Sequence, residues 1–286
     1  MEKIGLVLEG GGMRGVYTAG VLDFFLEQEF HLPYVIGVSA GACHAASYIS
    51  RQHGRNKKVN IGFIRDPRYL SYRNLLQSRS LFGMDFIFNE IPNKLVPFDY
   101  NTFYQSPQRY VIGTTNCQTG EPVYFNKEEC GPDLILKVLM ASSSLPFVSP
   151  IVNINGLDLL DGGITDPIPI KRSMADGNEK HLIVLTRPRD YRKTAFKQKW
   201  LAQKVYRKYD GLVQAMVNRH QIYNNTLDLI ENLEQEGKAI VLRPSKPIQV
   251  DRLEKNVQKL NELFALGYQD ASSAHWRILE WIDSEH

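Results

Sequence analysis

The sequence predicts one domain of the α/β class. The chain has 286 residues, of which 43% are hydrophobic and 23% are charged, a size and composition that suit an ordinary soluble enzyme with a substantial core. Two short apolar segments, Ile4 to Leu8 and Tyr34 to Val38, each lead through a glycine motif into a segment of helical character. The chain has no repeats, low-complexity tracts or Pro/Gly/Ser-rich linkers, so nothing in it marks a second domain.

Predicted helices and strands follow one another along the rest of the chain. Hydrophobic periodicity predicts helices over residues 16–29, 40–52, 133–142 and 195–236, the last broken near Gly211, and two more helices before the C-terminus. The remaining strands are expected over residues 109–115, 122–125, 151–154, 157–160, 181–186 and 239–243, the first two joined as a hairpin.

The segment 59–105 does not read as a regular strand and helix unit. It lacks clean periodicity, is rich in aromatic residues and contains the breakers Pro67, Pro92 and Pro97. Long irregular segments in compact domains are often lids or binding loops. We therefore keep two interpretations: a cover that shapes an acyl pocket, and a surface excursion that packs its own aromatic side chains.

The first glycine motif follows the first predicted strand and precedes a helix. Backbone N–H groups in such a loop converge on an anion without side chains in the way. Gly10, Gly12 and Gly15 fit the dinucleotide fingerprint Gly-x-Gly-x-x-Gly, so a dinucleotide site competes with an oxyanion hole. The dinucleotide fingerprint requires an acidic residue at the end of the second strand, but this strand ends in Gly37-Val38-Ser39. A phosphate-binding P-loop requires a lysine after the last glycine, but Val16 follows Gly15. Neither requirement is met.

The second motif, at residues 37–41, is Gly-x-Ser-x-Gly and indicates a nucleophile elbow. In that geometry the serine sits on a tight turn between a strand and a helix, and the flanking glycines let the backbone bend without a Cβ clash. Ser39 is therefore the candidate nucleophile, and the elbow is completed by Gly37, Ala40 and Gly41.

The third motif places an aspartate at the end of a strand. Asp161 closes the strand predicted over 157–160 and is backed by Gly162 and Gly163, so it is expected where loops project from the sheet. Three serines at 142–144 end the preceding helix, where serine is common as a local hydrogen-bonding residue. Ser39 is expected to be the only essential serine.

Together, in this order and spacing, the three motifs resemble those of the patatin-like phospholipases. The resemblance covers residues 4–170, and the C-terminal strand and helices within 181–286 look like those of bacterial members. It implies a three-layer α/β/α fold with a central, mainly parallel sheet, and hydrolysis of lipid carboxylic esters without a cofactor or metal. It also implies a catalytic dyad of Ser39 and Asp161 without histidine, and an oxyanion hole made by Gly10, Gly11, Gly12, Arg14 and Gly15.

Two residues of the motifs need separate comment. The family usually has Asn before the proline that follows the aspartate motif, whereas this chain has Asp166 before Pro167, which affects the expected hydrogen bonding of the Asp161 loop. Arg14 has two interpretations, either to counter the phosphate of a phospholipid or to pin the loop by pairing with a carboxylate.

The expected mechanism is acyl transfer in two steps. Asp161 accepts the Ser39 proton, Ser39 attacks the ester carbonyl, and water activated through Asp161 hydrolyses the acyl-enzyme. Two alternatives stay open: an α/β-hydrolase with a Ser, Asp, His triad, and a nucleotide- or lipid-binding module without catalysis. The triad needs a histidine after Asp161, for which the internal candidates are His181, His220 and His275; His44 lies on the helix leading away from the elbow.

The net charge and the cysteine content indicate which partners and which cellular compartment to expect. A net charge of +3 does not demand nucleic acid, though it suits a protein that visits an anionic lipid surface. The three cysteines show no disulfide or metal-ligand spacing, and Met1-Glu2-Lys3 leads straight into a strand, so a cytoplasmic protein is expected.

A basic and aromatic run within residues 197–209 could provide a peripheral membrane contact. Basic and aromatic side chains together suit the head-group region of a membrane, while a solvated charged face is the alternative meaning of such a run. The run comprises Lys197, Lys199, Trp200, Lys204, Tyr206, Arg207, Lys208 and Tyr209.

Overall fold

Apolar strands without alternation form the centre of the molecule. All five residues of β1 (Ile4–Leu8) and of β2 (Tyr34–Val38) are buried, which is typical of strands covered on both faces. The computed structural model describes residues 3–247 and 249–284, without the side chains of residues 77 and 78. Met1 and Glu2, which the sequence places directly before the first strand, lie outside the described residues.

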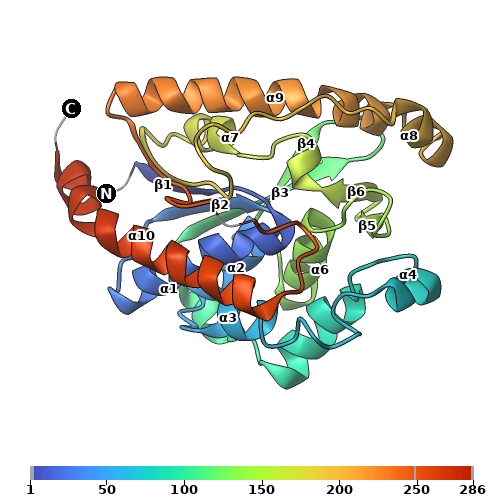
Figure 1. Cartoon of the computed structure of the whole chain (residues 1–286), viewed down its shortest axis with the longest axis horizontal. Coiled ribbons are helices and arrows are strands. Elements are labelled where there is room, and N and C mark those ends of the chain that lie inside the picture. Colours follow the sequence, from blue (N-terminus) through green and yellow to red (C-terminus); the bar gives the residue numbers. More distant parts are fainter. Residues whose placement is uncertain (1–2, 248, 285–286) are drawn as a thin grey trace.

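The described residues build one mixed sheet of eight strands (Figure 1). Its order is β5-β6-β3-β2-β1-β7-β8, with β4 paired to β3. The strands β3, β2, β1, β7 and β8 run parallel, whereas β4, β5 and β6 join by antiparallel pairing. The further strands are β3 (Arg109–Asn116), β4 (Pro122–Asn126), β5 (Val152–Ile154), β6 (Leu157–Asp161), β7 (Lys180–Val184) and β8 (Ala239–Leu242).

Helices cover both faces of the sheet. In Figure 1, α7 and α9 lie above the sheet, and α1, α2, α3 and α10 lie below it. The helices are α1 (Val16–Glu27), α2 (Ala40–Ile49), α3 (Arg55–Asn60), α4 (Tyr72–Ser78), α5 (Tyr100–Gln105), α6 (Pro132–Ser142), α7 (Ile170–Ala175), α8 (Lys199–Val205), α9 (Asp210–Gln235) and α10 (Val257–Asp283). Short 3₁₀ turns are η1 (Gly12–Gly15), η3 (Lys127–Glu129) and η4 (Gly162–Ile164), and η2 (Phe86–Leu95) is a π-helix. The predicted three-layer α/β/α fold is confirmed.

Three element predictions were wrong. Pro92 lies inside η2, where the buried Phe86, Phe88 and Ile91 hold the segment against the core. Residues 195–198 are not helical, and the two predicted C-terminal helices are the single helix α10. Tertiary packing decides these cases, which local patterns do not show. By contrast, the predicted break near Gly211 is confirmed, since α8 ends at Val205 and α9 begins at Asp210.

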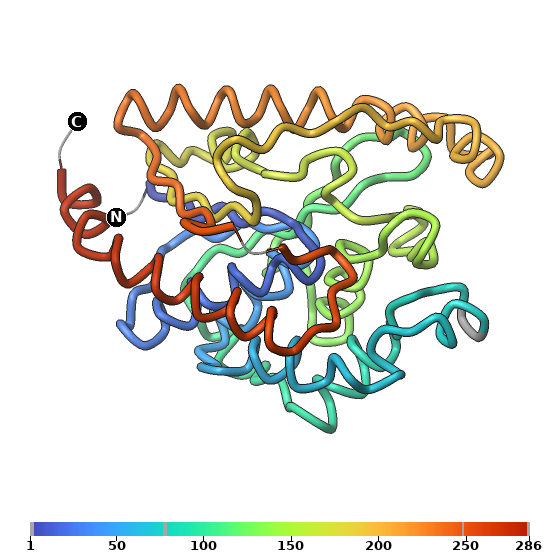
Figure 2. Tube along the Cα trace, viewed as in Figure 1, coloured from blue at the N-terminus to red at the C-terminus, as the bar shows by residue number. Residues whose placement is uncertain are grey.

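The C-terminal helix packs unusually closely on the first helix (Figure 2). A Cβ on Gly267 of α10 would lie 2.1 Å from the carbonyl oxygen of Tyr17, and one on Gly20 of α1 would lie 2.0 Å from that of Phe264. The Tyr17 hydroxyl also donates to Asp270 at 3.0 Å. The two helices therefore meet backbone to backbone, and only glycine fits at the contact.

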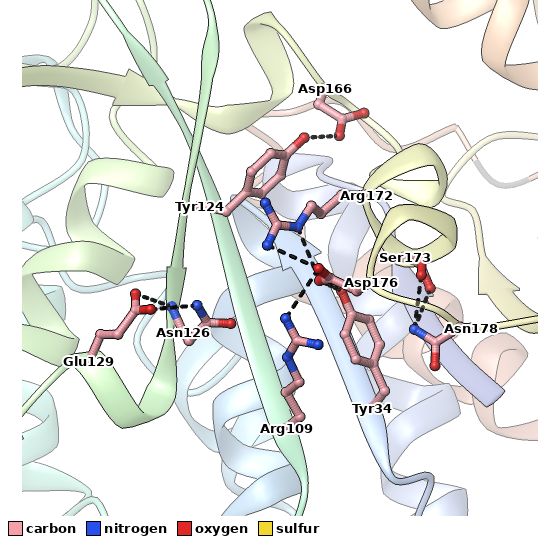
Figure 3. Close-up of polar contacts among 10 residues, drawn as sticks. All are labelled: Tyr34, Arg109, Tyr124, Asn126, Glu129, Asp166, Arg172, Ser173, Asp176 and Asn178. Carbon is pink, nitrogen blue, oxygen red and sulfur yellow. Dashed lines mark hydrogen bonds and ion pairs between the residues drawn. The ribbon is translucent and has the colours of Figure 1, made fainter. Parts of the chain in front are cut away.

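An acidic residue after α7 ties that helix to the starts of two strands (Figure 3). Asp176 accepts a hydrogen bond from the Tyr34 hydroxyl at 2.7 Å and forms ion pairs with Arg172 at 3.0 Å and Arg109 at 3.1 Å. Tyr34 begins β2 and Arg109 begins β3, so this network lies at the edge of the sheet opposite to the end of β2. This network holds α7 in place at the starts of the strands, and it leaves free the opposite end of β2, where the chain continues beyond Val38.

We expect Gly267→Ala to lower the free energy of unfolding by about 1–2 kcal/mol, because separating the two helices outweighs the gain of about 1 kcal/mol in helix propensity. Urea denaturation measures the change. Gly131→Ala is the control: Gly131 precedes α6 with φ −62°, and a Cβ there would meet nothing within 4 Å. A Gly267→Ala protein as stable as the Gly131→Ala protein would contradict the close contact.

Candidate active site

Ser39 lies on a tight turn between β2 and α2. Its φ of 54° and ψ of −129° fall in a region that residues other than glycine rarely occupy, the strained conformation expected at a nucleophile elbow. A Cβ on Gly41 would lie 2.7 Å from the carbonyl oxygens of Leu8 and Glu9, and one on Gly37 would lie 2.7 Å from the Ala42 nitrogen. The motif glycines thus let the first turn of α2 pack directly on the backbone of the sheet.

A second serine holds the turn from behind. The Ser39 N–H donates to the Ser142 hydroxyl oxygen at 2.8 Å, and the Ser142 hydroxyl donates to the Gly113 carbonyl at 2.7 Å. Ser142 is fully buried at the end of α6 and connects the elbow to β3. The sequence analysis treated this serine as a local helix-end residue and missed its long-range role, although a serine at the end of an otherwise apolar helix is a weak signal for one.

The same helix end holds Asp161. The Asp161 N–H donates to the Ser144 carbonyl at 2.8 Å, and the Asp161 carbonyl accepts from the Thr115 hydroxyl at 2.9 Å. The residue ends β6, in register with Thr114 of β3, and it begins the turn η4. Ser39 and Asp161, which are far apart in the sequence, therefore line one small cavity together with Gly10, Gly11 and Gly12.

The Asp161 carboxyl group is buried, and only one of its two oxygens has a hydrogen-bond partner among the described residues. Its Oδ1 accepts from the Gly163 N–H at 2.7 Å, whereas Oδ2 has no hydrogen-bond partner among the described residues. Burial raises the pKa of Asp161, and the neighbouring Ser39 hydroxyl, the Arg219 guanidinium, the Gly163 N–H and Arg252 oppose this rise. The Ser39 hydroxyl is thus one of the groups that favour the ionised form of this carboxyl.

Within the described residues, no histidine forms a hydrogen bond with Asp161 or Ser39. His181 contacts Ser173 at the opposite end of its strand, and His275 packs against Phe24 and Phe30. His220 lines a cavity that Asp161 also lines, but its Nδ1 lies 2.9 Å from the Val217 carbonyl oxygen. Burial lowers the pKa of His44, on α2, to about 4, so its ring is neutral at pH 7.

The glycine loop lies against the elbow. A Cβ on Gly10 would lie 3.0 Å from the Ser39 Cβ, and one on Gly15 would lie 2.7 Å from the Ala40 Cβ. The N–H groups of Gly10 and Met13 donate to the carbonyls of Pro167 and Arg252, while those of Gly11 and Gly12 have no acceptor in the described part of the chain. Two free donors therefore remain beside Ser39.

Arg14 does not pin the loop through a paired carboxylate. It forms no ion pair with any residue that the structure describes, and its buried Nε has no hydrogen-bond partner there. Burial, followed by repulsion from Arg187 and Arg252, lowers its pKa to about 10, an effect that Glu9 partly offsets. The Glu9 carboxylate instead accepts hydrogen bonds from the hydroxyls of Thr186 and Tyr223.

An apolar cavity of about 120 Å³ begins at Ser39. Its lining includes Ala40 and Cys43 of α2 and Leu139 of α6, and most of its aromatic surface comes from the segment 59–105. Members of that segment that line the cavity are Val59, Asn60, Tyr69, Phe82, Met84, Ile87, Phe88, Ile91, Pro92 and Phe98. The segment is therefore not a surface excursion alone, because it walls a cavity that reaches the elbow.

The substitution at position 166 is accommodated locally. Asp166 accepts a hydrogen bond from the Tyr124 hydroxyl at 2.5 Å, and its own N–H donates to the Gly162 carbonyl at 2.9 Å (Figure 3). Burial raises the pKa of Asp166, while the Tyr124 hydroxyl lowers it. The aspartate motif keeps its turn with Asp in this position.

The basic and aromatic run within residues 197–209 exposes only some of its side chains to solvent. Trp200 on α8 is 65% exposed, whereas Tyr206 is buried and receives a hydrogen bond from the Phe147 N–H, and the Tyr209 hydroxyl donates to Asp158. None of the helices in the described residues has the length and apolar character needed to cross a bilayer. Membrane contact through this run stays a prediction.

We expect Ser142→Ala to lower the free energy of unfolding by about 1–3 kcal/mol, because it leaves the buried Ser39 N–H and Gly113 carbonyl without their shared partner. Ser144→Ala is the matched control, since Ser144 is equally buried but its hydroxyl only donates to Met140 within the same helix, at 3.0 Å. Chemical denaturation of both variants measures the difference. Equal stability losses would count against a special role for Ser142.

Comparison with known proteins agrees with this geometry. A model of the patatin-like phospholipase family matches residues 6–173, and a domain of unknown function, DUF6363, matches residues 209–283. The uncharacterized protein YjjU of Escherichia coli is 28% identical over 276 residues, which is 93% of this chain and 75% of that protein.

Among solved structures, VipD from Legionella pneumophila is similar with a TM-score of 0.48 and 13% identity, over 96% of this chain and 66% of that one. The family match extends over more than half of the sequence and includes the glycine loop, Ser39 and Asp161. The chain belongs to the patatin-like phospholipase family, whose general activity is the hydrolysis of lipid esters.

Proposed function

We propose that the protein is a serine acyl hydrolase that cleaves carboxylic esters of phospholipids or related lipids through a dyad of Ser39 and Asp161. The observation that carries this proposal is the shared cavity in which a strained serine meets a buried carboxylate and two free loop N–H groups. The two residues are also the ones that the sequence resemblance assigns as nucleophile and base.

In the first step, Asp161 removes the Ser39 proton as the serine oxygen attacks the ester carbonyl. An aspartate with its ordinary pKa is a weak base, and burial makes the Asp161 carboxylate more basic. The negative charge that develops on the carbonyl oxygen is stabilised by the N–H groups of Gly11 and Gly12. The alcohol then leaves, and water activated by Asp161 releases the acyl group.

The acyl chain of the substrate occupies the apolar cavity. This cavity starts at Ser39 and is lined by the aromatic and aliphatic side chains of the segment 59–105, so it fits a hydrocarbon chain next to the reacting carbonyl. Its volume of about 120 Å³ suits part of a hydrocarbon chain. The segment then serves as the wall of the acyl pocket.

Ser39→Ala is expected to abolish ester hydrolysis, and Asp161→Asn to lower kcat/KM by about 10³-fold or more, because each removes a group that acts on the reacting atoms. Fluorophosphonate labelling of Ser39, followed by mass spectrometry, checks the nucleophile directly and excludes a binding module without catalysis. A folded Ser39→Ala protein that keeps more than a few per cent of the activity would contradict the elbow assignment.

The same assay separates the dyad from a triad. His44→Ala, His181→Ala, His220→Ala and His275→Ala are each expected to stay within about tenfold of wild type. His220→Ala is the most informative of the four, because His220 alone lines a cavity with Asp161. A folded histidine variant as inactive as Ser39→Ala would support the triad instead.

The pH profile should report the Asp161 carboxyl. Because this group acts in its ionised form and burial raises its pKa, kcat/KM is expected to fall at acid pH with an apparent pKa above 3.8, the ordinary value for aspartate. Arg219→Met removes a positive charge that favours the ionised form, so the acid limb should move to higher pH. Arg219→Lys keeps the charge and is expected to move it less; an equal shift in both variants would rule out the charge as the cause.

A further inference from the structure

A cavity of about 810 Å³ next to Asp161 is lined by six positively charged side chains: Arg14, the exposed Lys197 and four others. The four others are Arg187, Lys193, Arg219 and Arg252, and within the described residues none of them forms an ion pair. Arg14, whose buried Nε lacks a partner, lines the same cavity. Cations gathered in this way repel one another unless an anion lies between them.

The pKa values show how unfavourable this arrangement is without an anion. Burial, followed by repulsion from Arg219, Arg252, Arg14 and Arg187, lowers the pKa of Lys193 to about 7. Burial and the charge of Arg252 lower the pKa of Arg219 to about 10. A bound anion would reverse both effects, because opposite charge favours the protonated forms.

The acidic groups around the cavity offset the cluster only in part, since the charges of Asp161 and Glu9 raise the pKa of Arg219 while burial keeps it lowered. Glu9 is bound by Thr186 and Tyr223, and Asp161 is bound by Gly163. Asp251 lines the cavity but is exposed to solvent. Guanidinium and ammonium groups that are left without carboxylates are well suited to phosphate oxygens.

The position of the cavity fits one part of an ester substrate. Both this cavity and the small one at Ser39 are lined by Leu145, Asp161, Gly163, Arg219 and Arg252. The apolar cavity also begins at Ser39, but neither Arg219 nor Arg252 lines it. An ester with its acyl chain in the apolar cavity would therefore place its alcohol part toward the cations.

Apart from Arg14, the cations come from outside the part of the chain that matches the patatin-like family. That match ends at residue 173, whereas Arg219 on α9 and Arg252, in the loop before α10, belong to the match of unknown function over residues 209–283. This region also touches the catalytic loops directly. Arg219 Nε donates to the Gly163 carbonyl, and the Arg252 carbonyl accepts from Met13 N–H at 3.1 Å.

We propose that Arg187, Lys193, Arg219 and Arg252 form a receptor for the phosphate on the alcohol part of a lipid ester. In this arrangement, which rests on the proposed acyl hydrolase function, the region of unknown function supplies Arg219 and Arg252, and the segment before it supplies Arg187 and Lys193. The enzyme then selects phosphate-bearing glycerolipids over neutral acylglycerols. Arg219 and Arg252 have a second effect, because their charges also act on Asp161, whereas Arg187 and Lys193 are not among the groups that set the Asp161 pKa.

The test compares two esters with the same short acyl chain, hexanoyl glycerol phosphate and hexanoyl glycerol, both as monomers in solution. We expect Arg187→Met and Lys193→Met each to lower kcat/KM for the phosphate ester about tenfold or more, because each removes a charge-assisted hydrogen bond. For the neutral ester, we expect kcat/KM to change less than about threefold. Arg189→Met, an exposed arginine outside the cavity, is the control for overall charge. Equal losses on both esters, or no loss on either, would overturn the proposal.

A binding measurement separates this proposal from the proposed hydrolysis. Ser39→Ala protein is titrated calorimetrically with glycerol phosphate, inorganic phosphate and glycerol, so catalysis does not enter. We expect glycerol phosphate to bind, glycerol not to bind, and Lys193→Met in the same background to weaken the binding about tenfold. Inorganic phosphate that binds as tightly as glycerol phosphate would indicate a free-phosphate site and overturn head-group recognition, as would a lack of binding by all three. If both esters resist wild-type protein while glycerol phosphate binds, only the hydrolase proposal fails.

Discussion

The end of helix α6 is the constraint on which the site depends. Two residues apart, Ser142 bonds the backbone of Ser39 through its side chain, and Ser144 bonds the backbone of Asp161 through its carbonyl. The helix is itself held to β3 by the bond from Ser142 to Gly113. Because one rigid element positions both residues, their separation does not depend on the flexibility of two independent loops.

The glycines make this placement sterically possible. Gly41 lets α2 pack on the end of β1, and Gly10 lets the first loop pack on Ser39. Gly162 lets the aspartate turn pack on β3, where a Cβ at this position would lie 2.2 Å from the Gly113 carbonyl oxygen. At Gly41 and Gly162 the distance is too short for any Cβ, and at Gly10, where it is 3.0 Å, a Cβ would force Ser39 to shift by a few tenths of an ångström. The three motifs are therefore one packed unit in space, although more than a hundred residues separate the first from the last.

The sequence was sufficient to predict the strands, the elbow and the aspartate turn, because their patterns are local: Gly-x-Ser-x-Gly after an apolar strand, and Asp-Gly-Gly after another. It was insufficient for Ser142, whose partners lie 103 and 29 residues away, and for Arg219 and Arg252, whose positions follow from how α9 and α10 pack. Pro92 shows the reverse error, since its local tendency to break a helix yields to the burial of Phe88 and Ile91. Contacts between distant segments decide these cases, and one sequence carries no direct signal for them.

In the proposed mechanism, the cations next to Asp161 reconcile two opposing requirements of a base without histidine. Burial raises the pKa of the carboxyl and favours its protonated form, which cannot accept a proton. Arg219 and Arg252 oppose this rise, so the group can be ionised and still more basic than an aspartate in water. An anion bound among these cations would weaken their effect on Asp161 and make the carboxylate more basic once substrate is present. If both proposals hold, binding of the head group and the strength of the base are coupled through Arg219 and Arg252.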